Sequence, residues 1–344
     1  MEQHVQKQPD SPVPFFLWRH LNTVRRLVLL LVFCLLILLP YISLYQNFVA
    51  GHAYDLLTPH ERRIYDVMEW LTAPIARSDP ANNLNMIKGN TWSGTLFGLK
   101  LSDPLAVVGQ VAAQFKLYWP FLLTALLPVG LTLLLGRFYC GWICPATLLY
   151  EINDAVRHRL VRLGILAQGR RMDLRLKYGV LAVGVGLSTA LGTVVFSAIY
   201  PPLIVGREIQ YWVTANGVGA GTTFFLLTLL FDLLVARRGF CRYLCPGGAL
   251  YALLGRYRLV RIQRLVNRCN DCTLCDKVCP FALRPMRDAF GQECNNCTAC
   301  MAVCPPRALT FRLRIQDQPD QGPGHQGPAH RRAAVRVTAK GEVA

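Results

Sequence analysis

The sequence predicts an all-α membrane domain, with four transmembrane helices arranged as a duplicated hairpin, followed by a smaller α+β domain rich in cysteine. Four long apolar runs and two clusters of evenly spaced cysteines support this prediction. Apolar residues make up 53% of the chain and charged residues only 17%. Each run is close to the roughly 20 residues that a helix needs to cross a bilayer. The runs cover residues 27–48, 117–136, 178–200 and 211–236, the last interrupted only by Asp232.

The first apolar run is expected to remain as an anchor, because its apolar core is too long for a signal peptide and no small-residue cleavage site follows it. The other segments follow from the runs and the cysteine motifs. In chain order we expect a cytoplasmic arm (1–24), a first transmembrane helix (25–48), an extracytoplasmic segment with an amphipathic helix (49–116), a second transmembrane helix (117–137), a cytoplasmic cysteine motif with a basic loop (138–177), a third transmembrane helix (178–200), an outer loop (201–210), a fourth transmembrane helix (211–236), a second cysteine motif with a basic interfacial helix (237–266), the cysteine-rich domain (267–313) and a disordered tail (314–344).

The distribution of charge predicts the orientation in the membrane. The net charge is +17, and residues 237–268 contain eight arginines and no acidic residue. Residues 49–116 instead balance six basic against six acidic residues. This asymmetry follows the positive-inside rule and predicts a multi-pass protein of the bacterial inner membrane with both termini in the cytoplasm. The basic stretches suit lipid headgroups, and no basic groove with interleaved aromatic residues indicates nucleic acid.

The two cysteine clusters have the spacing C-x2-C-x2-C-x3-C-P, at residues 269–280 and 294–305. This is the bacterial ferredoxin pattern for [4Fe–4S] clusters, in which the fourth cysteine of each run binds the other cluster. Two zinc sites with four cysteines each are the alternative, but such sites usually separate their cysteine pairs by a longer loop and lack the prolines. The sequence therefore predicts two ligand sets: Cys269, Cys272, Cys275 and Cys304 for one cluster, and Cys294, Cys297, Cys300 and Cys279 for the other.

Four further cysteines form two C-x3-C-P pairs, each directly after an apolar run that leads toward the cytoplasm. The pairs are Cys140 with Cys144 and Cys241 with Cys245, and they align at an offset of 101 residues, which also matches Tyr150 to Tyr251. The stretches SDPLAVVGQ (102–110) and YPPLIVGRE (200–208) resemble each other as well. A duplicated hairpin would bring the four thiols together for a third cluster. A structural role, another metal such as copper, or thiol redox chemistry are the alternatives.

Two carboxylates near these pairs are candidate proton acceptors. Asp232 is the acidic residue within the fourth apolar run, and Glu151 follows the first C-x3-C-P pair. A carboxylate within a membrane span is costly unless it is paired or hydrated. An ion pair between Asp232 and Arg237 or Arg238 is the structural alternative. The seven histidines all lie outside the apolar runs, which argues against a membrane haem.

The outer segment contains TPHERRIYDVMEWL (58–71), in which Thr58, Pro59 and Glu61 form the start signal of a helix. Ile64, Val67, Met68 and Leu71 then recur at helical spacing. The pattern predicts an amphipathic helix on the outer membrane surface or a docking face for an extracytoplasmic redox partner.

The chain resembles the NapH/MauN family of membrane-bound ferredoxin-type proteins. The resemblance depends on the segments 89–106, 138–160 and 231–255 together with the two ferredoxin runs, and it covers about residues 20–313. The outer insert near 49–88 and the tail depart from the family pattern.

The resemblance implies electron transfer between the membrane quinol pool and a respiratory or periplasmic redox enzyme system, as expected of a quinol dehydrogenase subunit with a redox partner subunit. We expect quinol to be oxidised near the inner membrane face, close to the four C-x3-C-P cysteines, with Asp232 or Glu151 accepting protons. An alternative is an electron donor for the maturation of a copper or other redox enzyme. An iron–sulfur redox sensor is a third.

Overall fold

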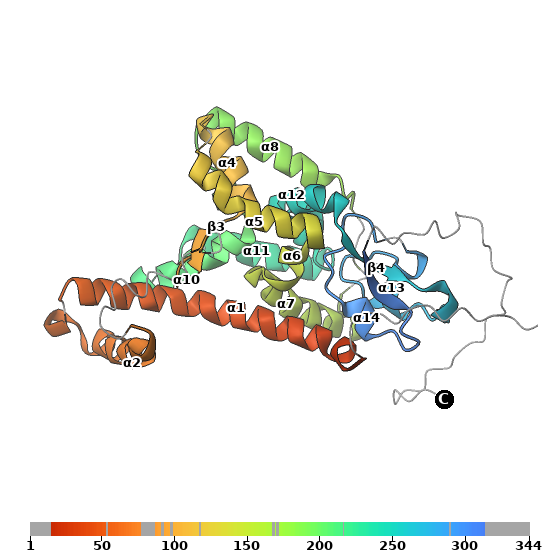
Figure 1. Cartoon of the computed structure of the whole chain (residues 1–344), viewed down its shortest axis with the longest axis horizontal. Coiled ribbons are helices and arrows are strands. Elements are labelled where there is room, and N and C mark those ends of the chain that lie inside the picture. The colour runs from red at the N-terminus through yellow and green to blue at the C-terminus, as the bar shows by residue number, and fades with distance from the viewer. Residues whose placement is uncertain are drawn as a thin grey trace, which may run out of the picture.

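The computed structural model describes residues 15–52, 54–76, 87–90, 93–96, 99–116, 118–166, 169, 172–215, 217–288 and 290–313. Most of the expected cytoplasmic arm and the whole expected tail lie outside the described residues. The chain is mainly helical and elongated (Figure 1). Helix α1 (Phe15–Ala50) runs along most of its length. Within the described residues, α1 is the one helix that is long and apolar enough to cross a membrane by length and composition.

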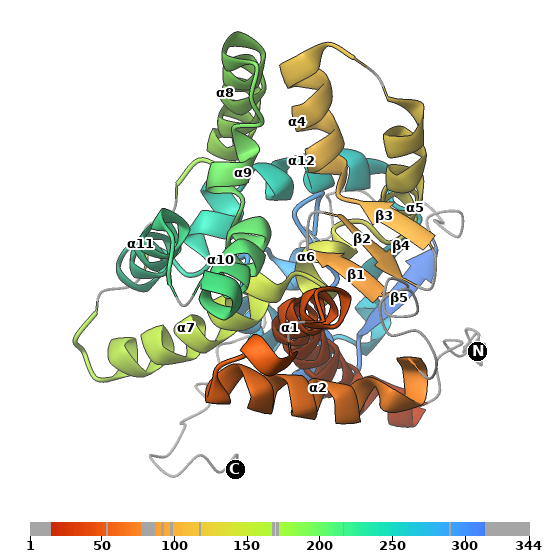
Figure 2. The ribbon, with the colours of Figure 1, turned by 90° about the vertical axis from the view of Figure 1, so that its left-hand side faces the viewer.

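Helix α2 (Pro59–Ala76) follows α1 and lies across its end (Figure 2). A short 3-10 turn, η1 (Tyr54–Leu56), separates the two helices. The start of α2 is capped as the sequence indicates, because the backbone N–H of Thr58 donates to Glu61 Oε2 at 2.8 Å. Met68 packs against Ile42 and Tyr45 of α1, so one face of the helix is buried. Val67 and Trp70 of α2 remain exposed.

A three-stranded antiparallel sheet precedes the two repeats, and nothing in the sequence pattern predicted it. Its strands are β1 (Ile87–Asn90), β2 (Ser93–Leu96) and β3 (Leu99–Ser102), in that order. The register pairs Asn90 with Ser93 and Leu96 with Leu99 at the two tight connections. Strand β3 leads directly to Asp103, which caps the next helix.

The two repeats have the same order of elements. Each has a helix that begins at a proline, a second helix that is strongly apolar, a turn with the C-x3-C-P motif, and another helix that begins at the motif's proline. In the first repeat these are α4 (Pro104–Gln114), α5 (Trp119–Leu135), α6 (Phe138–Trp142) and α7 (Pro145–Arg162). In the second they are α10 (Pro201–Ala215), α11 (Ala220–Leu234), the π-helical turn η3 (Phe240–Leu244) and α12 (Pro246–Leu254). Proline favours the first helical position, where its missing N–H costs no hydrogen bond.

The helix boundaries differ from the expected spans in the second repeat. Helix α8 (Leu176–Leu191) ends at Gly192, whose left-handed φ of 65° stops the helix before the expected end at residue 200. The chain then turns into α9 (Phe196–Ile199), whose first residue packs against Gly184 of α8. The expected outer loop, residues 201–210, is the first part of α10. The expected fourth span therefore holds the end of α10 and all of α11.

The C-terminal module contains both helices and strands and lies at the opposite end of the molecule from α2 (Figure 1). Its sheet has two antiparallel strands, β4 (Val260–Arg264) and β5 (Leu309–Leu313), which contribute Ile262 and Leu309 to the core. The helical turns are η4 (Gly255–Tyr257), η5 (Val266–Arg268), α13 (Leu274–Val278), η6 (Pro285–Arg287) and α14 (Ala299–Ala302).

Candidate metal centres

Each of the two predicted ferredoxin ligand sets lines a cavity of its own. The first ferredoxin cavity is lined by Cys269, Cys272, Cys275 and Cys304. The second ferredoxin cavity is lined by Cys279, Cys294, Cys297 and Cys300. The fourth cysteine of each run thus belongs to the cavity of the other run, as the spacing predicts.

The backbone of both runs is bent in the same way. Asp271 and Thr273 in the first run and Asn296 and Thr298 in the second have φ between 51° and 61°. Asp and Asn enter this left-handed region easily, but for a β-branched threonine it is strained. Strain of this kind is kept at functional sites. Alternating left-handed turns also direct backbone N–H groups into a concavity, which favours an anionic group.

The donor chemistry of these cavities suits a cluster better than a single ion. Among the described residues, no three His, Cys, Asp or Glu side chains lie close enough together to hold one metal ion. A cubane cluster keeps its four cysteine sulfur atoms farther apart than a single zinc ion does. Burial raises the pKa of Cys275 and of Cys294 to about 11, so these thiols stay protonated at neutral pH until a bound metal displaces the proton.

The two C-x3-C-P pairs converge on a third cavity, here called the junction cavity. Its lining includes Cys140, Cys144, Cys241 and Cys245, so both repeats contribute a pair. Cys144 and Cys245 occupy the cap positions of α7 and α12, where helix dipoles favour negative charge. Burial raises the pKa of both thiols to about 12, and neighbouring thiols add to the effect. The cavity therefore has the four donors of an all-cysteine cluster site.

A buried aromatic group beside the junction cavity was not found by sequence reasoning. The rings of Tyr139 and Tyr251 stack with centroids 5.2 Å apart. Tyr200 lines the cavity and donates its hydroxyl to Asp103 Oδ2 at 2.8 Å. Asp103 also accepts from the backbone N–H of Leu105 at 2.8 Å and so fixes the start of α4. The similarity between residues 102–110 and 200–208 is the sequence signal that could have revealed the contact between Asp103 and Tyr200, because it places these two residues at equivalent starts of α4 and α10.

Asp232 is buried and serves as a hydrogen-bond acceptor for the second motif. Its Oδ1 accepts from the backbone N–H of Phe240, 2.7 Å away, at the start of the π-helical turn. Asp232 is not the carboxylate that pairs with Arg237 or Arg238. Arg237 pairs with Asp154 at 2.7 Å, and Arg238 pairs with Glu151 at 3.0 Å. Asp232 does not line the junction cavity.

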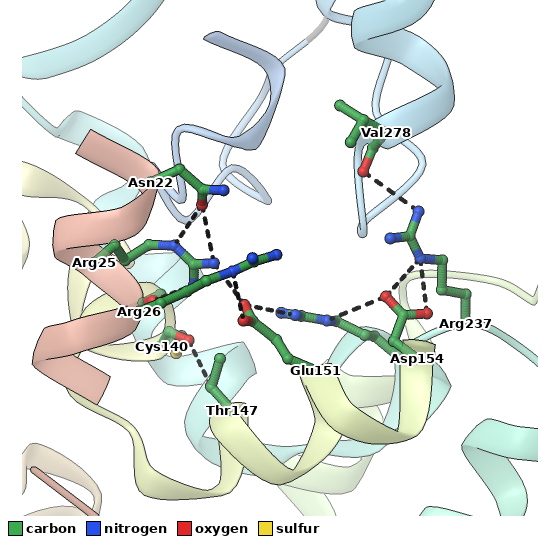
Figure 3. Close-up of polar contacts among 11 residues, drawn as sticks. Asn22, Arg25, Arg26, Cys140, Thr147, Glu151, Asp154, Arg237 and Val278 are labelled. Atoms are coloured by element: carbon green, nitrogen blue, oxygen red, sulfur yellow. Dashed lines mark hydrogen bonds and ion pairs between the residues drawn. The ribbon is translucent and has the colours of Figure 1, made fainter. Parts of the chain in front are cut away.

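Glu151 lies at the centre of an ionic network (Figure 3). Its Oε1 is 2.7 Å from Arg25 of α1 and 3.0 Å from Arg238, and Arg26 approaches Oε2 at 3.8 Å. Burial alone raises the pKa of Glu151, but Arg238 and Arg25 outweigh burial and hold the pKa below its ordinary value. The carboxylate therefore stays ionised and ties α1, α7 and the second motif together.

Comparison with known proteins identifies relatives that are ferredoxin-type proteins. A family described as a 4Fe-4S binding domain matches residues 117–163 and 218–266, the two stretches that carry the C-x3-C-P pairs. The chain is 34% identical to the methylamine utilization ferredoxin-type protein MauN of Paracoccus denitrificans, over 59% of this chain and 70% of that protein. It is 31% identical to MauN of Methylorubrum extorquens, over 68% and 80% of the two chains. The ferredoxin-type protein NapH of Escherichia coli is 31% identical over 59% and 69%. No solved structure matches the chain.

Proposed function

Because the chain belongs to the family of ferredoxin-type proteins that includes MauN and NapH, we propose that it carries electrons between the membrane quinol pool and a respiratory or periplasmic redox system. Iron–sulfur electron transfer is the general activity that the family and the 4Fe-4S binding domain indicate. The quinol, the membrane topology and the number of clusters are the specific parts of the proposal.

The proposed topology has four helices in the bilayer: α1, α5, α8 and α11. The last three have 17, 16 and 15 residues, somewhat fewer than the roughly 20 that a full crossing needs. The arginine-rich stretches around the cysteine motifs favour the cytoplasmic face, which places the C-terminal module inside and α2 outside.

Three [4Fe–4S] clusters are the proposed cofactors, one in each four-cysteine cavity. A bound cluster supplies one-electron redox chemistry. The residues of the chain exclude water from the junction cavity, because Tyr150 and Tyr200 are buried around it and α4 and α10 begin beside it. The junction cavity lies at the proposed inner ends of the apolar helices, where a lipid-soluble reductant can reach it, and it adjoins the C-terminal module. Quinol oxidation there releases two electrons and two protons.

The two candidate proton acceptors, Glu151 and Asp232, differ in how easily their surroundings allow them to take up a proton. Glu151 is held as an anion by two arginines, so its role is structural. Asp232 accepts one backbone hydrogen bond, and its neighbouring arginines pair with other carboxylates. We therefore propose Asp232, and not Glu151, as the proton acceptor.

The convergence of Cys140, Cys144, Cys241 and Cys245 on one cavity is the observation that supports the proposal most. Its test is the iron and acid-labile sulfide content of anaerobically purified protein, compared with a variant in which these four cysteines are changed to serine. We expect about twelve irons per chain to fall to about eight, four for each cluster. Rapid reduction of the native clusters by a quinol analogue should accompany the higher count and be lost in the variant. About eight irons in both proteins would refute the third cluster.

A further inference from the structure

Arg137 lies where the junction cavity meets the second ferredoxin cavity. Its side chain is 1% exposed and lines the junction cavity together with Cys140 and Cys245. Phe281 lines both cavities, and its ring centroid is 5.2 Å from the guanidinium carbon of Arg137. One arginine of the first repeat is therefore in contact with the walls of two cysteine sites.

Glu293 holds the guanidinium in this position. Nη1 of Arg137 donates to the Glu293 carboxylate at 2.7 Å and to the Glu293 backbone carbonyl at 3.2 Å, one residue before Cys294. The same carboxylate accepts from Lys177 Nζ and, at 3.1 Å, from the Tyr178 hydroxyl. Two cations thus share one anion, which leaves an excess of positive charge in a buried region. Charge in such a region acts strongly on its neighbours, because the effective dielectric constant is low.

The rest of the guanidinium adjoins the junction cavity. A Cβ atom on Gly248 would lie 3.0 Å from Nη2 of Arg137, so the guanidinium packs closely against this point of α12 and an alanine there would require it to shift by a few tenths of an ångström. The Gly248 backbone N–H itself donates to Cys245 Sγ at 3.3 Å. Nε of Arg137 is buried and has no hydrogen-bond partner within the described part of the chain. A buried donor without a partner is unfavourable, and an anionic group in the cavity would give it one.

We propose that Arg137, anchored by Glu293, is a positioning residue that sets the reduction potential of the cluster in the junction cavity and couples that cluster to its neighbour in the second ferredoxin cavity. The inference depends on the proposed function, because it requires a cluster in the junction cavity. Positive charge and hydrogen bonds to a cluster stabilise its more negative, reduced form and so raise its potential. With a cluster bound in each cavity, Arg137 would lie beside the transfer of one electron from one cluster to the other, and that transfer would neither form nor break a bond.

The test is a redox titration of the purified full-length protein followed by electron paramagnetic resonance, with iron counted in every sample. The main variant is Arg137→Gln, which removes one positive charge while Lys177 still pairs with Glu293. We expect full iron content and a lower potential of the junction cluster. A shift of about 59 mV corresponds to a tenfold change in the ratio of oxidised to reduced cluster for one electron. Arg137→Lys keeps the charge and should keep the potential of the junction cluster close to its native value.

Arg264 provides a matched control at another site. It lines the first ferredoxin cavity and pairs with Asp271 and Asp288. Arg264→Gln should therefore change the potential of the cluster in the first ferredoxin cavity and leave the junction cluster unchanged. An unchanged junction potential in Arg137→Gln, with about twelve irons present, would overturn the role of Arg137 and leave the proposed function intact. About eight irons in the native protein would instead refute the junction cluster and the role of Arg137 together.

Discussion

Gly141 lies at the closest approach between the first C-x3-C-P motif and the C-terminal module, so replacing it with alanine should weaken that contact. A Cβ atom at this position would lie 2.5 Å from the Asn295 carbonyl oxygen and 3.3 Å from Asn295 Nδ2. Even a close C–H···O contact keeps carbon and oxygen about 3.3–3.6 Å apart, so the loop at Asn295 must move by roughly 1 Å. Asn295 belongs to the run that lines the second ferredoxin cavity.

The loop cannot make that movement freely, because hydrogen bonds hold it against the first repeat. Trp142 Nε1 donates to the Asn296 carbonyl oxygen at 3.0 Å, and Asn296 Nδ2 donates to the Leu135 carbonyl oxygen at 2.8 Å. Overpacking of a tight contact typically costs about 1–3 kcal/mol. The general gain from replacing a helical glycine with alanine, about 0.5–1 kcal/mol, offsets part of this cost. We expect Gly141→Ala to lower the free energy of unfolding by about 1–2 kcal/mol.

Gly130 is the matched control, because it also lies in a helix but a Cβ atom there would meet nothing within 4 Å. Gly130→Ala should leave the stability unchanged or raise it by up to about 1 kcal/mol. Denaturant unfolding of anaerobically purified protein, monitored by cluster absorbance, measures both changes. Hydrogen exchange should also become faster at residues 293–298 in Gly141→Ala alone. Equal stabilities of the two variants would refute the contact and the docking of the module that it represents.

Two further predictions concern the buried carboxylate and the outer helix. Glu293→Gln leaves Arg137 and Lys177 without their anion and should cost about 3–5 kcal/mol of unfolding free energy. Burial alone raises the pKa of Glu293, but the two cations hold it below its ordinary value of 4.5, so its stabilising effect is present above about pH 4.5 and lost as the pH falls through the lower value. The stability difference between Glu293→Gln and the native protein should therefore be constant above that pH and shrink below it; a difference that grows in acid would contradict the assignment. In α2, Met68→Ala should lower the free energy of unfolding by about 2–5 kcal/mol because Met68 is buried. Trp70→Ala should change it by no more than about 0.5 kcal/mol, because the Trp70 side chain is 77% exposed. Trp70→Ala should also reduce labelling of the protein by a membrane-embedded photoreactive lipid. Equal losses of stability would contradict the burial of one face of α2, and unchanged labelling would contradict its contact with lipid.

The grouping of the cysteines around common cavities could be predicted from the sequence because cluster chemistry restricts the spacing of its ligands. Three cysteines within seven residues and a fourth before proline leave few arrangements in which all thiols reach a cluster. The convergence of Cys140 and Cys144 with Cys241 and Cys245 followed from duplication, since equivalent turns of two equivalent hairpins meet at the same end. The structure groups the twelve cysteines in the same three sets.

The path of the chain between the apolar runs could not be predicted in the same way. Hydropathy measures how apolar a segment is, and it is the same for a helix that continues and for one that turns back. Gly192 ends α8 through its left-handed backbone, and α10 starts at Pro201 inside a segment that was expected to be a loop. The partners of buried charges were hidden for a related reason. Which of several nearby arginines pairs with Glu151 or Asp232 depends on packing angles that the sequence does not contain.

Duplication also explains how the junction cavity obtains its positive charge. Arg238 lies at the position of the second repeat that corresponds to Arg137 of the first, three residues before the first cysteine of each motif, and both side chains line the cavity. Four thiolates in one buried site are tolerable only with nearby countercharge, and the repeat supplies one arginine from each half. The partners have diverged: Arg137 is anchored by Glu293 of the C-terminal module, whereas Arg238 is anchored by Glu151 of α7. The two arginines share the task of charge compensation, but only the Arg137 ion pair reaches the segment that lines the second ferredoxin cavity. Divergence of the anchoring carboxylates thus makes the two sides of the proposed cluster site electrostatically different, although the cysteine pairs themselves are equivalent.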